Sequence, residues 1–285
     1  MATILSTINL KGGVGKTMTT VALAEMLSAH FRKKVLVIDL DPQTNATVVL
    51  IGEEKWAELN EKGSTLARLF ADAIEEGASH FDLEQTLQDN VSTIRDVRSV
   101  DLLPSSLDLI DIQDRLATMP RGKYYARNPI DIIRQAIKPI QDNYDLILID
   151  CPPNLGLITL NGLRISSGYI IPTVPDILST YGIPQIVKRV RDFSQEIGEE
   201  IVPLGIVVSK YREQSTVHHT TLANLRRRNS PPVFDTVIPE RNSIADAAGF
   251  VPTGTVRQKY GYDGSYDLYR NLATEIMTAA EASGV

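Results

Sequence analysis

Cysteine is almost missing from this sequence: Cys151 is the single thiol among 285 residues. One thiol cannot form a disulfide within the chain. It also cannot supply the thiolates of a Cys₄ zinc site or of an iron–sulfur cluster held by one chain. Because proteins without disulfides are typical of reducing compartments, we expect a cytoplasmic protein.

Long apolar runs and an excess of positive charge are missing as well. No run approaches the roughly 18 apolar residues that a membrane-spanning helix needs. The opening residues, MATIL, have neither the basic segment nor the cleavage site of a signal peptide and indicate a first strand. The net charge of −6 argues against a general affinity for nucleic acid but allows a local basic face.

Short apolar strands alternate with helices along the chain. Residues 35–39 and 146–150 are apolar up to a final aspartate, as expected of strands buried on both faces of a parallel sheet. The pattern predicts an α/β fold with a doubly wound, mostly parallel sheet flanked by helices. Since no linker or internal repeat divides the chain, we expect a single domain over residues 1–285. The expected strands are 4–8, 35–39, 101–104, 146–150, 169–173, 201–209 and 236–238, and the expected helices are 17–30, 66–73, 83–87, 129–140 and 267–280.

A phosphate-binding loop is the most specific signal in the sequence. Residues 10–17, LKGGVGKT, lie between an expected strand and an expected helix, which is the setting that such a loop requires. Glycines let backbone N–H groups turn toward phosphate oxygens, and the helix N-terminus adds a positive dipole. Lys16 can reach the β- and γ-phosphates, and the Thr17 hydroxyl can bind Mg²⁺. The expected nucleotide-binding residues of this loop are Lys11, Gly12, Gly13, Val14, Gly15, Lys16, Thr17 and Met18.

The loop departs from the usual pattern at its beginning. Leu10 stands where a glycine is expected, and a second lysine, Lys11, follows it. A cation beside the triphosphate would stabilise the charge that develops during phosphoryl transfer. In many nucleotide hydrolases such a cation comes from a partner. Lys11 could therefore act across a homodimer, and the alternative is a solvated loop lysine.

Aspartates end two of the expected strands. Asp39 and Asp41 end the second strand and face the same way, at the edge of the sheet where ligands bind in such folds. One of them could hold a water of Mg²⁺ and the other could orient the attacking water, although a solvated strand end is the alternative. Asp150 ends a Walker B-like strand and would bind Mg²⁺ through water. The turn that follows it, at 151–154, is placed to sense a γ-phosphate, and we expect Cys151 to be buried and inert.

Together these motifs resemble the ParA/MinD family of ATPases. Lys11–Thr17 resembles the deviant Walker A box of that family, Asp39–Gln43 its A′ motif, and Asp150–Pro153 its Walker B motif and switch. The segments LLPSSLDL at 102–109, TLNGL at 159–163 and TVIPERNSIADA at 236–247 look like ParA segments in the expected order. The resemblance covers nearly the whole chain.

The resemblance implies ATP and Mg²⁺ as cofactors, with Thr17, Asp39 and Asp150 at the metal. It implies an ATP-bound sandwich homodimer in which Lys11 contacts the partner's nucleotide, Lys16 serves the chemistry in its own subunit and Asp41 positions the hydrolytic water. The ATP dimer would bind DNA without sequence preference, as a cytoplasmic, nucleoid-associated protein. A small adaptor protein would stimulate hydrolysis, and the cargo would be a plasmid, a chromosome origin or a protein organelle such as a carboxysome.

A basic segment is the candidate DNA-binding face. Residues 186–228 carry eight cations and five carboxylates, a net charge of +3, whereas the remainder carries −9. Phosphate neutralisation supplies most non-specific affinity for DNA, and dimerisation would double the patch. The family often has basic residues where Glu240 and Ser243 stand, so we expect that loop to lie near the adenine through Pro239. The candidate DNA contacts are Lys188, Arg189, Arg191, Arg226, Arg227 and Arg228, and the alternative is a solvated charged face.

Other functions fit parts of the sequence. A MinD-like membrane-associated ATPase would need a basic amphipathic C-terminal helix. Residues 267–285 have one cation and three carboxylates, so we expect this helix to pack against the core. A metabolic P-loop enzyme, such as an ATP-dependent ligase resembling dethiobiotin synthetase, would need a substrate pocket near Lys11, and the ParA-like late segments argue against it. An electron-donating reductase ATPase is excluded because one cysteine cannot supply half of a shared cluster.

Overall fold

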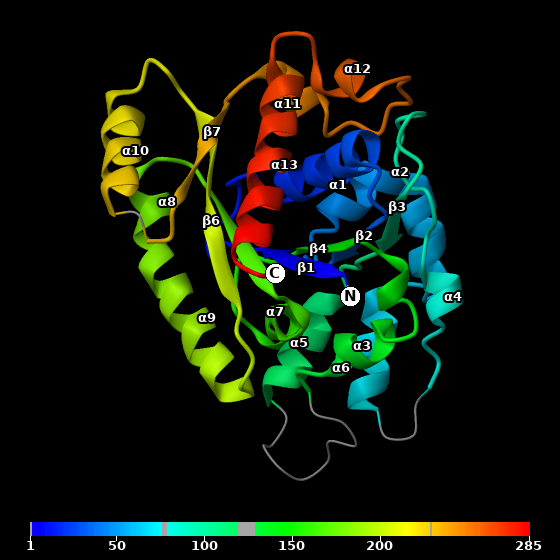
Figure 1. Ribbon diagram of the computed structural model, residues 1–285. Coiled ribbons are helices and arrows are strands. Elements are labelled where there is room, and N and C mark those ends of the chain that lie inside the picture. The colour runs from blue at the N-terminus through cyan, green and yellow to red at the C-terminus, as the bar shows by residue number, and fades with distance from the viewer. Residues whose placement is uncertain (1, 76–78, 119–128, 229) are drawn as a thin grey trace.

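A seven-stranded parallel sheet forms the centre of the protein (Figure 1). The computed structural model describes residues 2–75, 79–118, 129–228 and 230–285. The strand order is β3-β2-β4-β1-β5-β6-β7, and every neighbouring pair of these strands runs parallel. The predicted α/β fold is confirmed, and the sheet is parallel throughout rather than mostly parallel. The strands are β1 (Thr3–Thr7), β2 (Val35–Asp39), β3 (Val100–Leu103), β4 (Leu146–Asp150), β5 (Gly168–Thr173), β6 (Val202–Tyr211) and β7 (Val233–Pro239).

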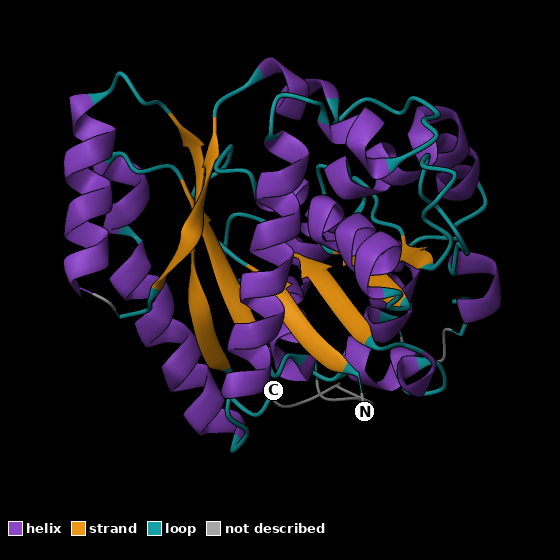
Figure 2. Cartoon of the chain, turned by 45° about the horizontal axis from the view of Figure 1, so that its top comes forward, coloured by secondary structure: helices purple, strands orange, loops and turns teal. Residues whose placement is uncertain are grey.

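Helices cover both faces of the sheet, which explains why its central strands are continuously apolar (Figures 1 and 2). Val35 and Val37 of β2 pack into the core on one face, and Leu36 and Ile38 pack into the core on the other. The first core includes residues of α1 (Lys16–Phe31), α2 (Asn45–Glu61), α12 (Val256–Tyr260) and α13 (Ser265–Ala282). The second includes residues of α3 (Leu66–Ile74), α5 (Leu109–Thr118), α6 (Ile132–Ile137), α7 (Leu157–Ile165), α9 (Ile183–Ile197) and α10 (Thr216–Arg228).

The expected strands and several expected helices lie within a few residues of the observed ones. The helix predicted at 129–140 is shorter in the structure, where α6 covers Ile132–Ile137. Helix α2 was not expected, because Gly52 interrupts its periodicity with φ 78° and ψ 163°. The long helices α9 and α10 were not expected either. The remaining short helices are α4 (Leu83–Thr86), η1 (Gln141–Asn143), α8 (Ile177–Tyr181) and α11 (Asn242–Asp246).

The C-terminal helix packs against the protein core, as expected. Tyr269, Leu272 and Ile276 of α13 are buried, and the helix contacts α1 and β7. Of the neighbouring tyrosines, Tyr260 is fully buried whereas Tyr262 is exposed. Within the described residues, no helix combines the length and the apolar character that crossing a bilayer would require.

Candidate nucleotide-binding site

The phosphate loop connects the carboxyl end of β1 to the N-terminus of α1, in the centre of the sheet. Gly13 and Gly15 have φ values of 75° and 83°, in the left-handed region that glycine adopts without steric cost. A Cβ on Gly15 would also lie 3.3 Å from the Ser209 hydroxyl oxygen. These two glycines are therefore required by the backbone, and Gly12 and Gly13 have open space where a side chain would stand.

Two polar side chains hold the loop from either end, and sequence reasoning missed both. Asn9 Oδ1 accepts a hydrogen bond from the Lys11 N–H (2.9 Å), while Asn9 Nδ2 donates to the Pro172 carbonyl on β5 (2.8 Å). The Ser209 hydroxyl on β6 donates to the Val14 carbonyl (2.6 Å). These contacts anchor the loop to the neighbouring strands, so its backbone N–H groups are held in place before a ligand binds.

The two lysines of the loop point to different surroundings. The Lys16 side chain is buried, with its ammonium 3.4 Å from the Lys11 carbonyl. The Lys11 ammonium instead donates to the Ser179 hydroxyl (2.8 Å) and forms an ion pair with Asp176 (3.3 Å), at the N-terminus of α8. The Lys11 side chain is 43% exposed, so it is available at the surface of the subunit.

The three predicted aspartates come together at the carboxyl edge of the sheet. Asp39 and Asp150 are partners in the register of β2 and β4. Asp39 Oδ1 accepts from the Asp41 N–H (3.1 Å), and its Oδ2 accepts from the N–H and the hydroxyl of Thr47 (2.9 and 2.7 Å). These bonds occupy Asp39 with the backbone of its own loop, so in this structure its carboxylate positions Asp41.

Asp150 has a different environment. Its Oδ2 accepts a hydrogen bond from the Thr17 hydroxyl (2.7 Å), and its Oδ1 is buried with no hydrogen-bond partner among the described residues. An orphaned buried acceptor next to a phosphate loop fits a hydrated cation. Thr17 and Asp150 are two oxygen ligands, and the described residues contain no protein-only cluster of metal ligands. That donor set suits Mg²⁺, which is usually held by one or two protein groups together with phosphates and waters.

Burial shifts the acidity of all three carboxyl groups. Desolvation raises the pKa of Asp150 to about 7, and desolvation together with the charge of Asp150 raises the pKa of Asp39 well above its usual range. Desolvation also raises the pKa of Asp41, against the opposing effect of the Lys16 ammonium. Three buried acids at one place are unfavourable without a cation, which is a second reason to expect one there.

We expect Asp150→Asn to raise the melting temperature of the metal-free protein. The asparagine Oδ1 can still accept from Thr17, and an unpartnered amide costs less to bury than an unpartnered carboxylate. Because the pKa of Asp150 is raised in the folded protein, the wild-type fold loses stability as the pH rises from the pKa of the unfolded state, near 4, toward the folded pKa of about 7. The gain in melting temperature should therefore be larger at pH 8 than at pH 6. The difference should be several degrees, because 1 kcal/mol of stability corresponds to about 2–4 °C.

Thermal melts in a chelator would measure this gain. Asp39→Asn is the matched control and should not be stabilised, because its amide NH₂ would face the N–H groups that the carboxylate accepts from. A lower melting temperature for Asp150→Asn at both pH values would contradict the prediction.

A cavity of about 410 Å³ lies against the phosphate loop. From the predicted nucleotide site it includes Gly12, Gly13, Gly15, Lys16, Thr17, Met18 and Asp41. Lys11, Val14 and Pro239 do not line it, so their nucleotide contacts remain predictions. Gln43, from the A′-like motif, and Pro153, from the turn expected to sense a γ-phosphate, line it as well. The lining residues that sequence reasoning missed are Asn45, Val48, Val49, Lys210 and Ala248.

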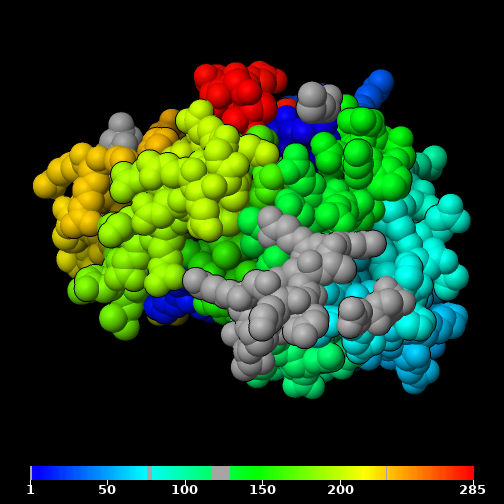
Figure 3. Space-filling model, turned by 90° about the horizontal axis from the view of Figure 1, so that it is seen from below, coloured from blue at the N-terminus to red at the C-terminus, as the bar shows by residue number. Residues whose placement is uncertain are grey.

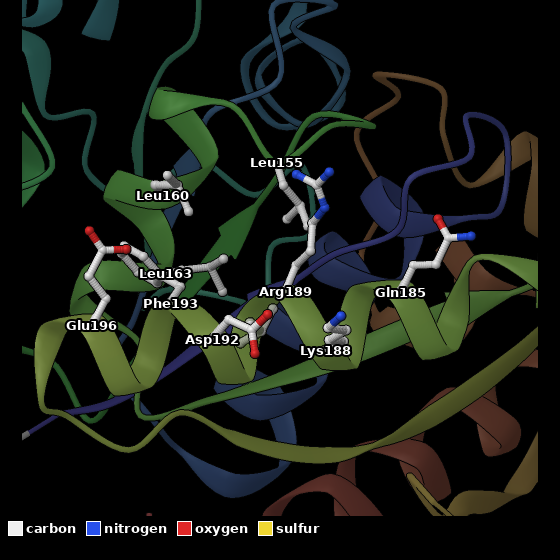
Figure 4. Close-up of a pocket in the computed structure, with 10 residues that line it drawn as sticks. Leu155, Leu160, Leu163, Gln185, Lys188, Arg189, Asp192, Phe193 and Glu196 are labelled. Carbon is white, nitrogen blue, oxygen red and sulfur yellow. The ribbon is translucent and has the colours of Figure 1, made fainter. Parts of the chain in front are cut away.

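The predicted DNA-binding cations lie on two helices on the same side of the molecule (Figures 1 and 3). Lys188, Arg189 and Arg191 are exposed on α9, and Arg226–Arg228 are exposed in the last turn of α10. A hollow of about 610 Å³, away from the phosphate loop, is lined by α7 and α9 (Figure 4). Lys188 and Arg189 share its lining with Asp192 and Glu196 (Figure 4), so the positive charge of α9 is partly offset there.

Comparisons with known proteins place the chain in a family and agree with its fold. A family model described as "AAA domain" matches residues 2–202. An uncharacterized protein of Pseudomonas putida is 34% identical over 250 residues, which are 88% of this chain and 86% of that protein. The chromosome-partitioning ATPase Soj of Thermus thermophilus is 29% identical over 273 residues, 96% of this chain and 94% of that protein.

A solved structure has the same fold. It is cobyrinic acid a,c-diamide synthase from Mycobacterium smegmatis with a bound ATP analogue and magnesium. The two chains superpose with a TM-score of 0.74, over 100% of this chain and 97% of that chain, at 24% sequence identity. At this identity the likeness shows the architecture alone.

Proposed function

The chain belongs to the AAA domain family of the matching model, as a ParA-like P-loop ATPase, and from this premise we propose that it is an ATP-driven partitioning switch. The observation that carries the proposal is the meeting of Lys16, Thr17 and Asp41 at one cavity, with Asp150 bonded to Thr17 and Lys11 directed to the surface. The switch would act as a single domain over residues 1–285.

The residues of one subunit account for nucleotide binding. Backbone N–H groups of the glycine-rich loop would hold the phosphates, and the buried Lys16 ammonium would neutralise their charge. Thr17 and Asp150 would hold Mg²⁺, with Asp39 beside them. Bound Mg²⁺ would offset the charge of the β- and γ-phosphates. Asp41, whose backbone is fixed by Asp39, would orient the water that attacks the γ-phosphate.

A second copy of the chain would complete the site. Lys11 does not line the cavity of its own subunit and has an exposed side chain, so its ammonium can serve the nucleotide of a partner. A cation supplied in this way is worth a large acceleration in other nucleotide hydrolases. ATP would thus join two subunits, and hydrolysis would separate them.

The dimer would bind DNA through the cations of α9 and α10, because pairing two subunits lengthens a patch that is weak in one. A small adaptor protein would stimulate hydrolysis and release the dimer from the nucleoid. One relative with a partitioning assignment is the Soj ATPase of Thermus thermophilus, and the match covers 96% of this chain.

Retention on arbitrary duplex DNA tests the proposal. ATP should permit binding and ADP should not, and the affinity should fall steeply with salt because phosphate contacts supply it. Retention that ignores the nucleotide or the salt concentration would contradict the switch.

The triple variant Arg226→Ala, Arg227→Ala, Arg228→Ala should bind DNA more weakly. Each lost phosphate contact should reduce the slope of log binding constant against log salt concentration by about 1 per subunit. Nucleotide affinity should stay unchanged because α10 does not line the cavity. The double variant Lys55→Ala, Lys62→Ala is the control, since both lysines pair with Glu58 on α2, outside the basic segment. Wild-type retention by the triple variant would move the DNA face to Lys188–Arg191.

An ATP-dependent biosynthetic enzyme is the second candidate, because the fold that this chain shares with the diamide synthase does not separate the two functions. This candidate predicts ATP turnover that depends on an acid substrate and not on DNA or a protein partner. Turnover assayed with and without duplex DNA separates the two functions.

A further inference from the structure

Lys210 has an unusual backbone conformation beside the nucleotide cavity. It lies near the end of β6, where the register with β7 shifts between Val208 and Tyr211, and its φ is 50°. A non-glycine residue in the left-handed region costs of order 1–2 kcal/mol. Such a conformation persists only where the surroundings impose it, and it is often found at functional sites.

The residues on either side of Lys210 impose this conformation. Before it, the Ser209 hydroxyl donates to the Val14 carbonyl of the phosphate loop (2.6 Å). After it, the Tyr211 carbonyl accepts from the Glu240 N–H (2.9 Å), and the Arg212 N–H donates to His218 Nδ1 (3.1 Å). The strand end is thus tied to the phosphate loop on one side and to β7 and α10 on the other, so Lys210 keeps a fixed place relative to the loop.

The Lys210 side chain is a cation that has no partner among the residues that the structure describes. It is exposed and lines the cavity together with Gly12, Gly13 and Gly15. It forms no ion pair with any residue that the structure describes, whereas Glu240, the carboxylate nearby, pairs with Arg212. The fold therefore presents an unpaired ammonium to the space in front of the glycine-rich loop.

The strand order decides which end of a nucleotide this cation faces. Asp39 and Asp150 end β2 and β4, on one side of β1, while Lys210 lies one residue before the end of β6, on the other side and two strands away. The carboxylates mark the side where Mg²⁺ and the γ-phosphate would lie. The opposite end of the nucleotide, with its α-phosphate, would then lie toward β6.

We propose that Lys210 is a nucleotide-binding cation that contacts the α-phosphate end of ATP and ADP within its own subunit. The proposal rests on the proposed nucleotide binding. It assigns to Lys210 a role different from those of Lys16 and Lys11: its contact would be the same before and after hydrolysis, so it would set affinity and not the rate of the chemical step.

Nucleotide titration of Lys210→Gly tests this proposal. Glycine removes the ammonium and relieves the backbone strain, so the variant should be at least as thermally stable as wild type. The Kd values of ATP and of ADP should both rise by about tenfold, the loss expected for one charge-assisted contact, while kcat at saturating ATP stays within about twofold. Lys210→Arg, which keeps the cation, should recover most of the affinity.

Arg32→Gly is a matched control. Arg32 is also a cation in the left-handed region, with φ 53°, at the C-terminus of α1, and it does not line the cavity. This variant should gain stability in the same way and bind both nucleotides as wild type does.

The outcomes separate this proposal from the proposed function. Absence of nucleotide binding by wild type would remove the proposed function, and the role of Lys210 with it. Wild-type affinity in Lys210→Gly would overturn the role of Lys210 alone. Weaker ATP binding with unchanged ADP binding would place the contact at the γ-phosphate and overturn the assignment. Weaker DNA retention with unchanged nucleotide affinity would also overturn it, because the cation would then belong to the DNA face.

Discussion

Replacing Asp41 with alanine should stop ATP hydrolysis, with a loss of about 10²–10⁴-fold in kcat, and should leave ATP bound. The reason is the way the side chain is held. The Asp41 N–H donates to Asp39 Oδ1, its carbonyl accepts from the Ser105 hydroxyl (2.8 Å), and its Oδ1 accepts from the Gln43 N–H (3.0 Å). The carboxylate is fixed at the cavity, and among the described residues its Oδ2 has no hydrogen-bond donor and is left to orient a water molecule.

The Asp41 variant should accumulate as an ATP-bound dimer, because the step that separates the subunits is lost. Single-turnover hydrolysis and light scattering with ATP would measure both effects. Asp41→Asn keeps the acceptor for Gln43 and should also be inactive, since the amide cannot offer two carboxylate oxygens. Wild-type turnover in either variant would remove Asp41 from the catalytic step.

Asp39 and Asp41 show what the sequence could not decide. Their spacing predicted that both face the ligand edge, and both do lie there. Their roles depend on the loop that follows, in which Thr47 donates twice to Asp39. Nothing in the short motif indicates that a threonine eight positions later occupies the first carboxylate and leaves the second at the cavity.

The strands were predictable because each is buried on both faces, which requires continuous apolar residues. The helices were less predictable than the strands. In α2, Gly52 has non-helical backbone dihedrals, and a Cβ added there would lie 2.8 Å from the Phe250 ring. The local geometry therefore depends on a contact with a residue 198 positions away. The hydrophobic periodicity of a short sequence segment carries no information about a contact so distant in the chain.

The same limit applies to the candidate site. The phosphate loop and its aspartates are contiguous motifs, and the sequence places them correctly at one edge of the sheet. Ser209 and Lys210 reach that loop from β6, almost two hundred residues later, and only the strand order brings them to it. The left-handed φ of Lys210 has no signal in the sequence, because lysine does not favour that conformation.

The two lysines of the phosphate loop should separate nucleotide binding from dimerisation. Lys16→Ala should weaken ATP binding by about 10²–10³-fold, the effect expected when a buried charged partner is truncated. Lys16 is 6% exposed and lines the cavity, and its ammonium partly opposes the desolvation that raises the pKa of Asp41 and Asp150. Its loss would remove the buried ammonium that faces both the phosphates and these acids.

Lys11→Ala is the matched variant within the same loop. Lys11 lies outside the cavity and pairs with Asp176 and Ser179, so its loss should leave the ATP affinity of the single subunit within about twofold of wild type. The variant should nevertheless remain monomeric with ATP and hydrolyse it about 10³-fold more slowly, because it removes the cation that each subunit lends to the other. Calorimetry on both variants would measure ATP affinity, and light scattering would measure dimerisation. Equal ATP affinity in wild type and Lys16→Ala would contradict the phosphate-loop assignment. An ATP-dependent dimer of Lys11→Ala would contradict the exchange of lysines between subunits.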